Sequence, residues 1–253
     1  MPERIIQVNG LNISLREEGQ GTPFLILHGW GSGKEPWKEV RDILSSKYRV
    51  IMFDFPGFGK SDAIPKPWNV DDFVNFFDSL LKEININESF YLAGQSFGGR
   101  VAIKYAVKYP ERIKEMFLID AAGIKHRKGL VKFIFYIIAK IFKKFSWFPG
   151  FNLFQKAFYK FVIRKTDYLH AIGTKKDTLV KVLKEDLTPL LDKINVKTHI
   201  IWGKNDRTTA IKDAYIMKER IKDSDLKILP GGHTPYRENP QLLANTILEI
   251  LKI

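Results

Sequence analysis

Residues 90–99 read FYLAGQSFGG, a short apolar run that leads directly into GQSFG at 94–98. The run has the length and composition of a buried strand, and the residues at 100–107, RVAIKYAV, have the spacing of a helix. A strand that passes through Gly-x-Ser-x-Gly into a helix is typical of a tight turn that lifts a serine hydroxyl clear of a sheet. The glycines permit a turn that bulkier residues would block. Ser96 is therefore a candidate nucleophile, and a glycine-rich turn without chemistry is the alternative.

Similar apolar runs recur on both sides of this turn, and most are separated by helical patterns. We expect strands at 4–8, 11–16, 24–27, 50–53, 90–93, 116–119, 198–202 and 226–229, and helices near 36–46, 70–84, 98–108, 210–222 and 240–252. The first two strands flank Asn9-Gly10, a strong two-residue hairpin signal. The alternation predicts an α/β fold with a mostly parallel sheet and helices on both faces. In such a sheet we expect the reactive residues at the carboxyl ends of the strands.

One interval breaks the alternation. Nearly eighty residues separate the strands ending at 119 and starting near 198, too many for a simple crossover. Much of this interval has helical periodicity. We expect a core domain formed by 1–123 and 191–253, and a helical cap inserted at 124–190.

The formal net charge of +13 is concentrated in one segment. Between positions 121 and 166 there is no Asp or Glu, and the basic residues are Lys125, Arg127, Lys128, Lys132, Lys140, Lys143, Lys144, Lys156, Lys160, Arg164 and Lys165. Aromatic residues alternate with these charges. One interpretation is that the aromatic residues attach the cap to the core while the lysines keep it soluble. The other is a cationic lid over an apolar channel, suited to anionic acyl esters, an acidic carrier or an anionic membrane surface.

Composition excludes several kinds of site. The chain has no cysteine, so it cannot form disulfides, thiolate metal sites or a cysteine nucleophile. The N-terminus lacks a basic segment followed by a long apolar core, and the longest apolar run, 133–139, is too short to span a bilayer. We therefore expect a cytoplasmic protein. No recognised motif accompanies the positive charge, which argues against nucleic acid as a partner. The sequence does not give the oligomeric state.

The loop HGWGSG at 28–33 follows the strand at 24–27. Its glycines allow the backbone N–H of Trp30 to point into the site beside the N–H of Phe97, where the two could hold the oxyanion of a tetrahedral intermediate. For His28 itself we favour a structural role, bonded to loop backbone.

Two further strand-end loops supply an acid and a base. Asp206 lies in GKND at 203–206 and could orient an imidazole, although an Asp at such a turn is also a common helix N-cap. His233 lies in PGGH at 230–233, and imidazole is the side chain best suited to proton exchange near neutrality. The chain order Ser96, Asp206, His233 is the order described for hydrolases of this architecture. Asp120, at another strand end, is a rival to Asp206 as the acid.

The chain resembles the α/β-hydrolase superfamily, in particular its capped branch of serine esterases. The matching stretches are HGWG (28–31), DFPGFGKSD (54–62), GQSFGG (94–99), GKND (203–206) and GH (232–233). They cover the core but not the cap. The loop at 54–62 is expected to be architectural.

The resemblance implies an eight-stranded sheet whose second strand is antiparallel, and no cofactor or metal. It also implies that Ser96, Asp206 and His233 form the triad and that Trp30 and Phe97 are the oxyanion donors. A serine rather than an aspartate nucleophile argues against the dehalogenase and epoxide hydrolase relatives. Carbon–carbon bond hydrolases and cofactor-free peroxidases share the serine triad.

These observations predict a serine hydrolase that cleaves carboxylic esters, with an acyl-enzyme on Ser96 and His233 as general base. A noncatalytic ligand-binding protein on the same fold is an alternative of a different class, because fold alone does not give function.

Overall fold

The computed structural model describes residues 3–125 and 173–252. Its strands are β1 (Arg4–Val8), β2 (Leu11–Glu18), β3 (Pro23–Leu27), β4 (Arg49–Phe53), β5 (Phe90–Gln95), β6 (Ile113–Ile119), β7 (Thr198–Gly203) and β8 (Ser224–Leu229). Its α-helices are α1 (Lys38–Leu44), α2 (Val70–Glu83), α3 (Phe97–Lys108), α7 (Thr174–Lys184), α8 (Ile211–Arg220), α9 (Pro235–Glu238) and α10 (Pro240–Ile250). Short 3-10 turns occupy Glu35–Trp37, Pro110–Arg112 and Thr188–Lys193.

The strands form one eight-stranded sheet in the order β1-β2-β4-β3-β5-β6-β7-β8. Strand β2 is antiparallel to both of its neighbours, and the pairs from β4 to β8 are parallel. The expected α/β fold with an antiparallel second strand is thus confirmed. The hairpin is confirmed as well, because Val8 pairs with Leu11 and both turn residues, Asn9 and Gly10, have positive φ (51° and 78°).

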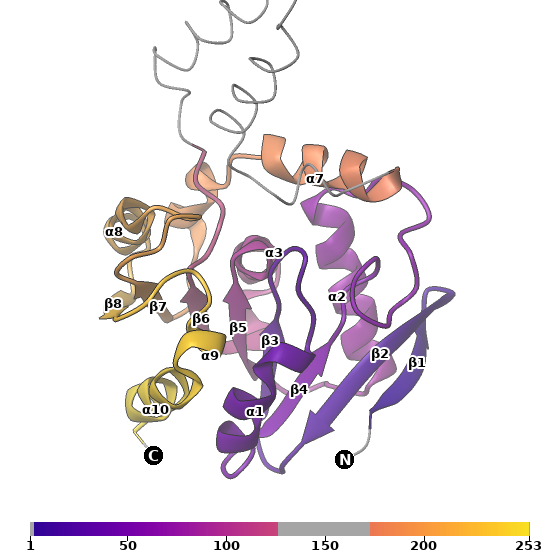
Figure 1. The fold of residues 1–253 in the computed structure, drawn as a ribbon, viewed down its shortest axis with the longest axis horizontal. Coiled ribbons are helices and arrows are strands. Elements are labelled where there is room, and N and C mark those ends of the chain that lie inside the picture. Colours follow the sequence, from indigo (N-terminus) through magenta and orange to yellow (C-terminus); the bar gives the residue numbers. More distant parts are fainter. Residues whose placement is uncertain (1–2, 126–172, 253) are drawn as a thin grey trace, which may run out of the picture.

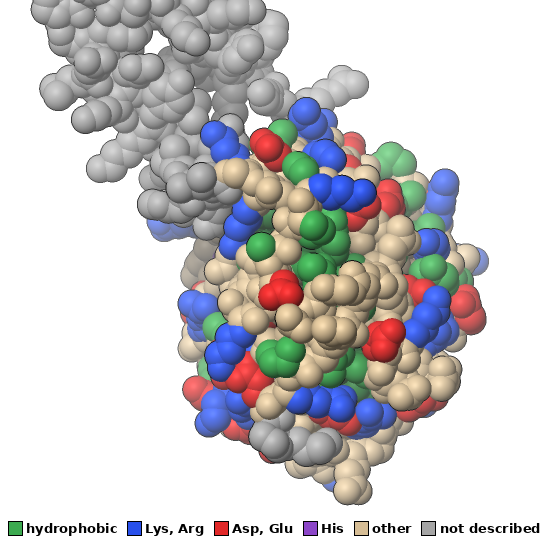
Figure 2. Space-filling model, turned by 90° about the vertical axis from the view of Figure 1, so that its right-hand side faces the viewer, with side chains coloured by type: hydrophobic (Ala, Val, Ile, Leu, Met, Phe, Trp, Pro, Cys, Tyr) green, Lys and Arg blue, Asp and Glu red, His purple; other side chains and the backbone are tan. Residues whose placement is uncertain are grey.

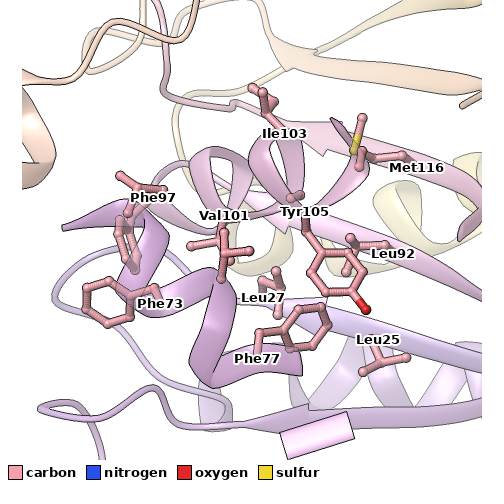
Figure 3. Packing of buried hydrophobic residues seen from close by; sticks show 14 of the residues in the cluster. Leu25, Leu27, Phe73, Phe77, Leu92, Phe97, Val101, Ile103, Tyr105 and Met116 are labelled. Carbon is pink, nitrogen blue, oxygen red and sulfur yellow. The ribbon is translucent and has the colours of Figure 1, made fainter. Parts of the chain in front are cut away.

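The apolar strands are continuous because both faces of the sheet are buried. Alternate residues enter different cores. Leu25 and Leu27 belong to a cluster that includes residues of α2, α3 and α8, whereas Phe24 and Ile26 belong to a second cluster, on the opposite face, that includes residues of α1 and α10. Figure 3 shows the first core, in which Phe77 of α2 and Tyr105 of α3 lie against the sheet. Because strands β3 to β8 are parallel, the loops that follow them lie at one edge of the sheet, where the candidate residues are found.

The cap expected at 124–190 lies mostly outside the described residues, including Lys140, Lys143, Lys144 and the aromatic residues between them. Its described part contains α7, which lies over the N-terminal end of α2 in Figure 1. The Trp68 N–H donates to Thr178 Oγ1 (3.1 Å), and the Val70 N–H donates to Glu185 Oε1 (2.9 Å). The division into core and cap remains a prediction. No helix within 3–125 or 173–252 is long and apolar enough to cross a membrane.

Candidate active site

Ser96 connects β5 to α3 in a strained conformation. Its φ of 51° and ψ of −111° are values that a non-glycine residue rarely adopts. The backbone is held there because the Ser96 N–H donates to Ile119 O (3.1 Å) and its carbonyl accepts from the Ala122 N–H (2.9 Å). The strain brings the serine side chain to the carboxyl edge of the sheet.

The two glycines of the motif permit the turn because a bulkier residue would not fit at either position, as expected from the sequence. Neither Gly94 nor Gly98 has a positive φ, and the strained residue is the serine itself. A Cβ on Gly98 would lie 2.1 Å from Leu27 O, and one on Gly94 would lie 2.6 Å from Gly98 O. These glycines are therefore required by the close approach of backbone segments rather than by a positive φ of their own.

The structure brings together the three side chains predicted to form the triad. Ser96 Oγ lies 3.0 Å from His233 Nε2, and His233 Nδ1 lies 2.7 Å from Asp206 Oδ2. The Asp206 side chain is fully buried, whereas His233 is 20% exposed. The imidazole can therefore accept a proton from the serine hydroxyl while its other nitrogen donates to the carboxylate.

Asp206 is held in its charged form. Its Oδ1 accepts the N–H groups of Thr208 (2.6 Å) and Thr209 (3.1 Å), and the Thr209 hydroxyl lies 2.6 Å from Oδ2. Burial alone would raise the pKa of Asp206, but the hydrogen bonds from His233 and Thr209 outweigh burial and keep the pKa below its ordinary value. A charged Asp206 can stabilise an imidazolium at His233.

The loop that carries His233 is held from two sides. Buried Gln95 Nε2 donates to the His233 carbonyl (2.9 Å), which fixes this loop to the strand that leads to Ser96. Glu238 on α9 accepts the N–H of Gly232 (2.6 Å) and that of Thr234 (3.2 Å). Sequence reasoning missed both residues. Gln95 occupies the first of the two variable positions of the Gly-x-Ser-x-Gly motif, and Glu238 resembles an ordinary surface acid.

Trp30 and Phe97, the expected oxyanion donors, lie next to each other. Their rings pack edge to face with centroids 5.4 Å apart. Phe97 is the first residue of α3, so its N–H has no acceptor within the helix. Trp30 lies in the loop after β3, the neighbour of β5. The two segments that carry these N–H groups therefore meet beside Ser96.

His28 has the structural role expected for it. The Phe55 N–H donates to His28 Nε2 (3.0 Å), and Nδ1 bonds the Gly29 carbonyl (2.8 Å). Complete burial lowers the pKa of His28 to about 4, so the ring is neutral at pH 7. It ties the loop after β3 to the loop after β4.

The loop at 54–62 supports the neighbouring loop, as expected for an architectural element. Asp54 accepts the Lys34 N–H at Oδ1 and the Lys34 ammonium at Oδ2, each at 2.7 Å. The same ammonium lies 2.7 Å from both Ser14 Oγ and Glu3 Oε1. Lys34 is completely buried, so this ion cluster fixes the end of the glycine-rich loop at 28–33. No sequence pattern indicates that this lysine is buried.

Asp120, the rival acid, is buried behind Asp206. One oxygen from each carboxylate and one ring nitrogen of His233 lie within 4.8 Å of one another, which is close enough for a metal ion. Asp206 and His233, however, already bond each other, and Asp206 also accepts hydrogen bonds from two threonines. A cation would have to displace these hydrogen bonds. We therefore interpret the three groups as a hydrogen-bonded set.

Comparisons with known proteins agree with this architecture. A family model described as "alpha/beta hydrolase fold" matches residues 22–146. The chain is 26% identical to the 2-hydroxy-6-oxo-6-(2'-aminophenyl)hexa-2,4-dienoic acid hydrolase of Metapseudomonas resinovorans, over 98% of this chain and 90% of that protein. It is 25% identical to the pimeloyl-[acyl-carrier protein] methyl ester esterase of Legionella pneumophila (strain Paris), over 96% of this chain and 100% of that protein. Among solved structures, a bacterial membrane phospholipase A has a TM-score of 0.78 at 24% identity, covering 99% of this chain and 86% of that one.

Proposed function

Since this chain belongs to the α/β hydrolase superfamily, we propose that it is a serine hydrolase that cleaves carboxylic esters. The observation that carries the proposal is the continuous hydrogen-bonded path from Ser96 through His233 to Asp206, with separations of 3.0 and 2.7 Å. That path is what a hydroxyl needs in order to lose its proton as it attacks a carbonyl carbon.

The reaction proceeds in two halves. His233 Nε2 takes the Ser96 proton as Oγ attacks the ester carbonyl, and the N–H groups of Trp30 and Phe97 stabilise the oxyanion. The imidazolium then gives its proton to the leaving alkoxide, so the alcohol departs and an acyl-enzyme remains. Water, deprotonated by His233, attacks this ester and releases the acid, and the proton returns to Ser96.

Carbon–carbon bond hydrolysis is the second candidate, because one of the relatives is named as a hydrolase of a hexa-2,4-dienoic acid. The name of the Legionella pneumophila relative favours ester cleavage. The two reactions need the same triad and differ in the leaving group, an alkoxide in one case and a carbanion in the other. A noncatalytic binding protein or a cofactor-free peroxidase has no comparable support.

The test is covalent labelling followed by turnover. A fluorophosphonate probe should label Ser96 in the folded protein but leave S96A unlabelled. A panel of p-nitrophenyl esters of rising acyl length should then be hydrolysed, whereas a 2-hydroxy-6-oxohexa-2,4-dienoate should not. Labelling without ester turnover but with cleavage of the dienoate would replace the ester proposal by the second candidate. Absence of labelling would overturn both.

Within the ester class, we infer a preference for an anionic acyl part. Lys175, at the start of α7, places its ammonium 4.3 Å from the centre of the Phe58 ring. Phe58 packs edge to face on Trp30, with centroids 4.9 Å apart. A positive charge therefore lies two aromatic rings away from the proposed oxyanion site, where it can attract a carboxylate or phosphate on the substrate. The proposal includes an acidic carrier or an anionic membrane surface as the partner that presents the substrate.

A further inference from the structure

Asp120 is a buried carboxyl group that the mechanism above does not use. It follows β6, is completely buried, and has a φ of 43°, which is rare for a residue with a side chain. Its Oδ1 accepts the Gly203 N–H at 2.8 Å. Its Oδ2 is shielded from solvent and has no donor among the described residues. A buried oxygen without a partner is costly and needs a physical explanation.

The explanation lies in what the carboxyl group faces. A ligand atom of Asp120 lies within 4.8 Å of one on Asp206 and one on His233. Two carboxylates cannot bond each other, because neither has a hydrogen to donate, and two like charges buried this close repel. If one of them carries a proton, the repulsion becomes a hydrogen bond and the unpartnered oxygen becomes a donor.

We propose that Asp120 is protonated at neutral pH and donates a hydrogen bond from Oδ2 to the Asp206 carboxylate, which makes it a positioning residue for the triad. The inference rests on the proposed function, since it concerns how Asp206 is oriented toward His233. It makes Asp120 a neutral partner of the triad acid rather than a substitute for that acid.

The hydrogen bonds decide which carboxyl group holds the proton. Asp206 accepts from Thr208, Thr209 and His233, all of which favour its charged form. The Asp120 carboxyl group accepts only the Gly203 N–H among the described donors. The proton therefore belongs on Asp120.

The titration of Asp120 agrees with this assignment. Burial raises the pKa of Asp120 to about 8, the Gly203 N–H lowers it, and Asp206 and Glu238 raise it. The groups that face Asp120 are thus Asp206, His233 and Glu238, from the loops after β7 and β8 and from α9. Because the pKa is raised, Asp120 is neutral below about pH 8 and becomes charged above it. Ionisation would remove the hydrogen bond and place a second negative charge beside Asp206.

Three substitutions test the role of Asp120 in turnover. D120N keeps a donor at this position, so at pH 7 it should recover most of the kcat that D120A loses. D120A should lose about tenfold in kcat with little change in KM, the typical effect of one positioning hydrogen bond. The wild type should lose activity as the pH rises through about 8, and D120N should lack this alkaline decline. D206N should lose about 10³–10⁴-fold, as expected for the acid itself.

An infrared measurement tests the proton without turnover. Wild type at pH 7 should show the carbonyl stretch of a protonated carboxylic acid, and the wild type minus D120N difference spectrum should assign this band to Asp120. If the band is present but no ester is hydrolysed, the proposed function fails and the protonation stands. Absence of the band, or a D120N variant as inactive as D206N despite an unchanged melting temperature, would overturn the inference.

Discussion

At the scale of single residues, Ser96 has a strained backbone conformation, with a φ of 51°. Residue type and loop position were enough to select Ser96, Asp206 and His233, because each follows a recognisable apolar strand. The sequence could not show that the positive φ belongs to the serine rather than to its flanking glycines. Dihedral angles depend on how β5, β6 and α3 pack around the turn, and this packing is not encoded locally.

The strain at Ser96 predicts an unusual order of stabilities. A non-glycine residue in this conformation costs about 1–3 kcal/mol, and glycine loses about 0.5–1 kcal/mol through its unfolded-state entropy. We therefore expect S96G to be about 1 kcal/mol more stable than S96A, because alanine keeps the Cβ atom and thus the strain. Chemical denaturation of both variants measures the difference.

Ser45 provides the matched control for this comparison. Its φ of −67° and ψ of −12° are ordinary helical values, so the order should reverse and S45A should be more stable than S45G. If the order were the same at both positions, strain at Ser96 would not be its cause.

At the scale of elements, the site is built from loops that follow β3, β5, β7 and β8. These loops could be predicted because buried strands are continuous apolar runs whose ends are easy to locate. The supports of the loops could not. Lys34 and Gln95 are polar residues whose partners lie far away in sequence, and Glu238, whose partners lie only four and six residues away, resembles an ordinary surface acid. Polar residues that pair over a long sequence separation show no repeating pattern, so their partners cannot be predicted from the sequence.

The buried ion cluster makes Lys34 the most sensitive of these supports. K34M would leave the Asp54 carboxylate buried without its cation, so we expect a loss of about 3–5 kcal/mol in the free energy of unfolding. Denaturant titration of the variant measures it. K38M serves as control, because Lys38 is 63% exposed and its removal should change stability by less than about 0.5 kcal/mol. An equal loss in both variants would show that the cluster contributes no special stability.

At the scale of the whole molecule, charge is unevenly distributed. The face drawn in Figure 2 mixes both signs, with blue Lys and Arg side chains interspersed among red Asp and Glu side chains. Most of the net charge belongs to the segment at 121–166, largely outside the described residues. The core could be predicted because its order of elements is regular. The cap could not be placed, since helical periodicity alone does not fix where a helix packs.

Lys175 allows the proposed preference for anionic substrates to be tested within the described part of the chain. We expect K175Q to lower kcat/KM about fivefold for a p-nitrophenyl ester of glutaric acid at low salt, because a charge near the site contributes about 1 kcal/mol. The neutral pentanoate ester should be unaffected. K184Q, about 13 Å further along the same helix, is the control and should leave both rates unchanged. Equal losses for the two esters in K175Q would rule out charge recognition.

The ion cluster around Lys34 also determines what should happen first when the protein is warmed. Glu3 and Ser14 belong to the β1–β2 hairpin region at one edge of the sheet, and both contact the lysine that ends the loop carrying Trp30. Segments near a chain terminus, such as Glu3, are commonly the first to open locally. Heating should therefore abolish ester hydrolysis at a temperature at which the core is still folded. Cooling should restore the activity, because the intact core allows the hairpin to pack again.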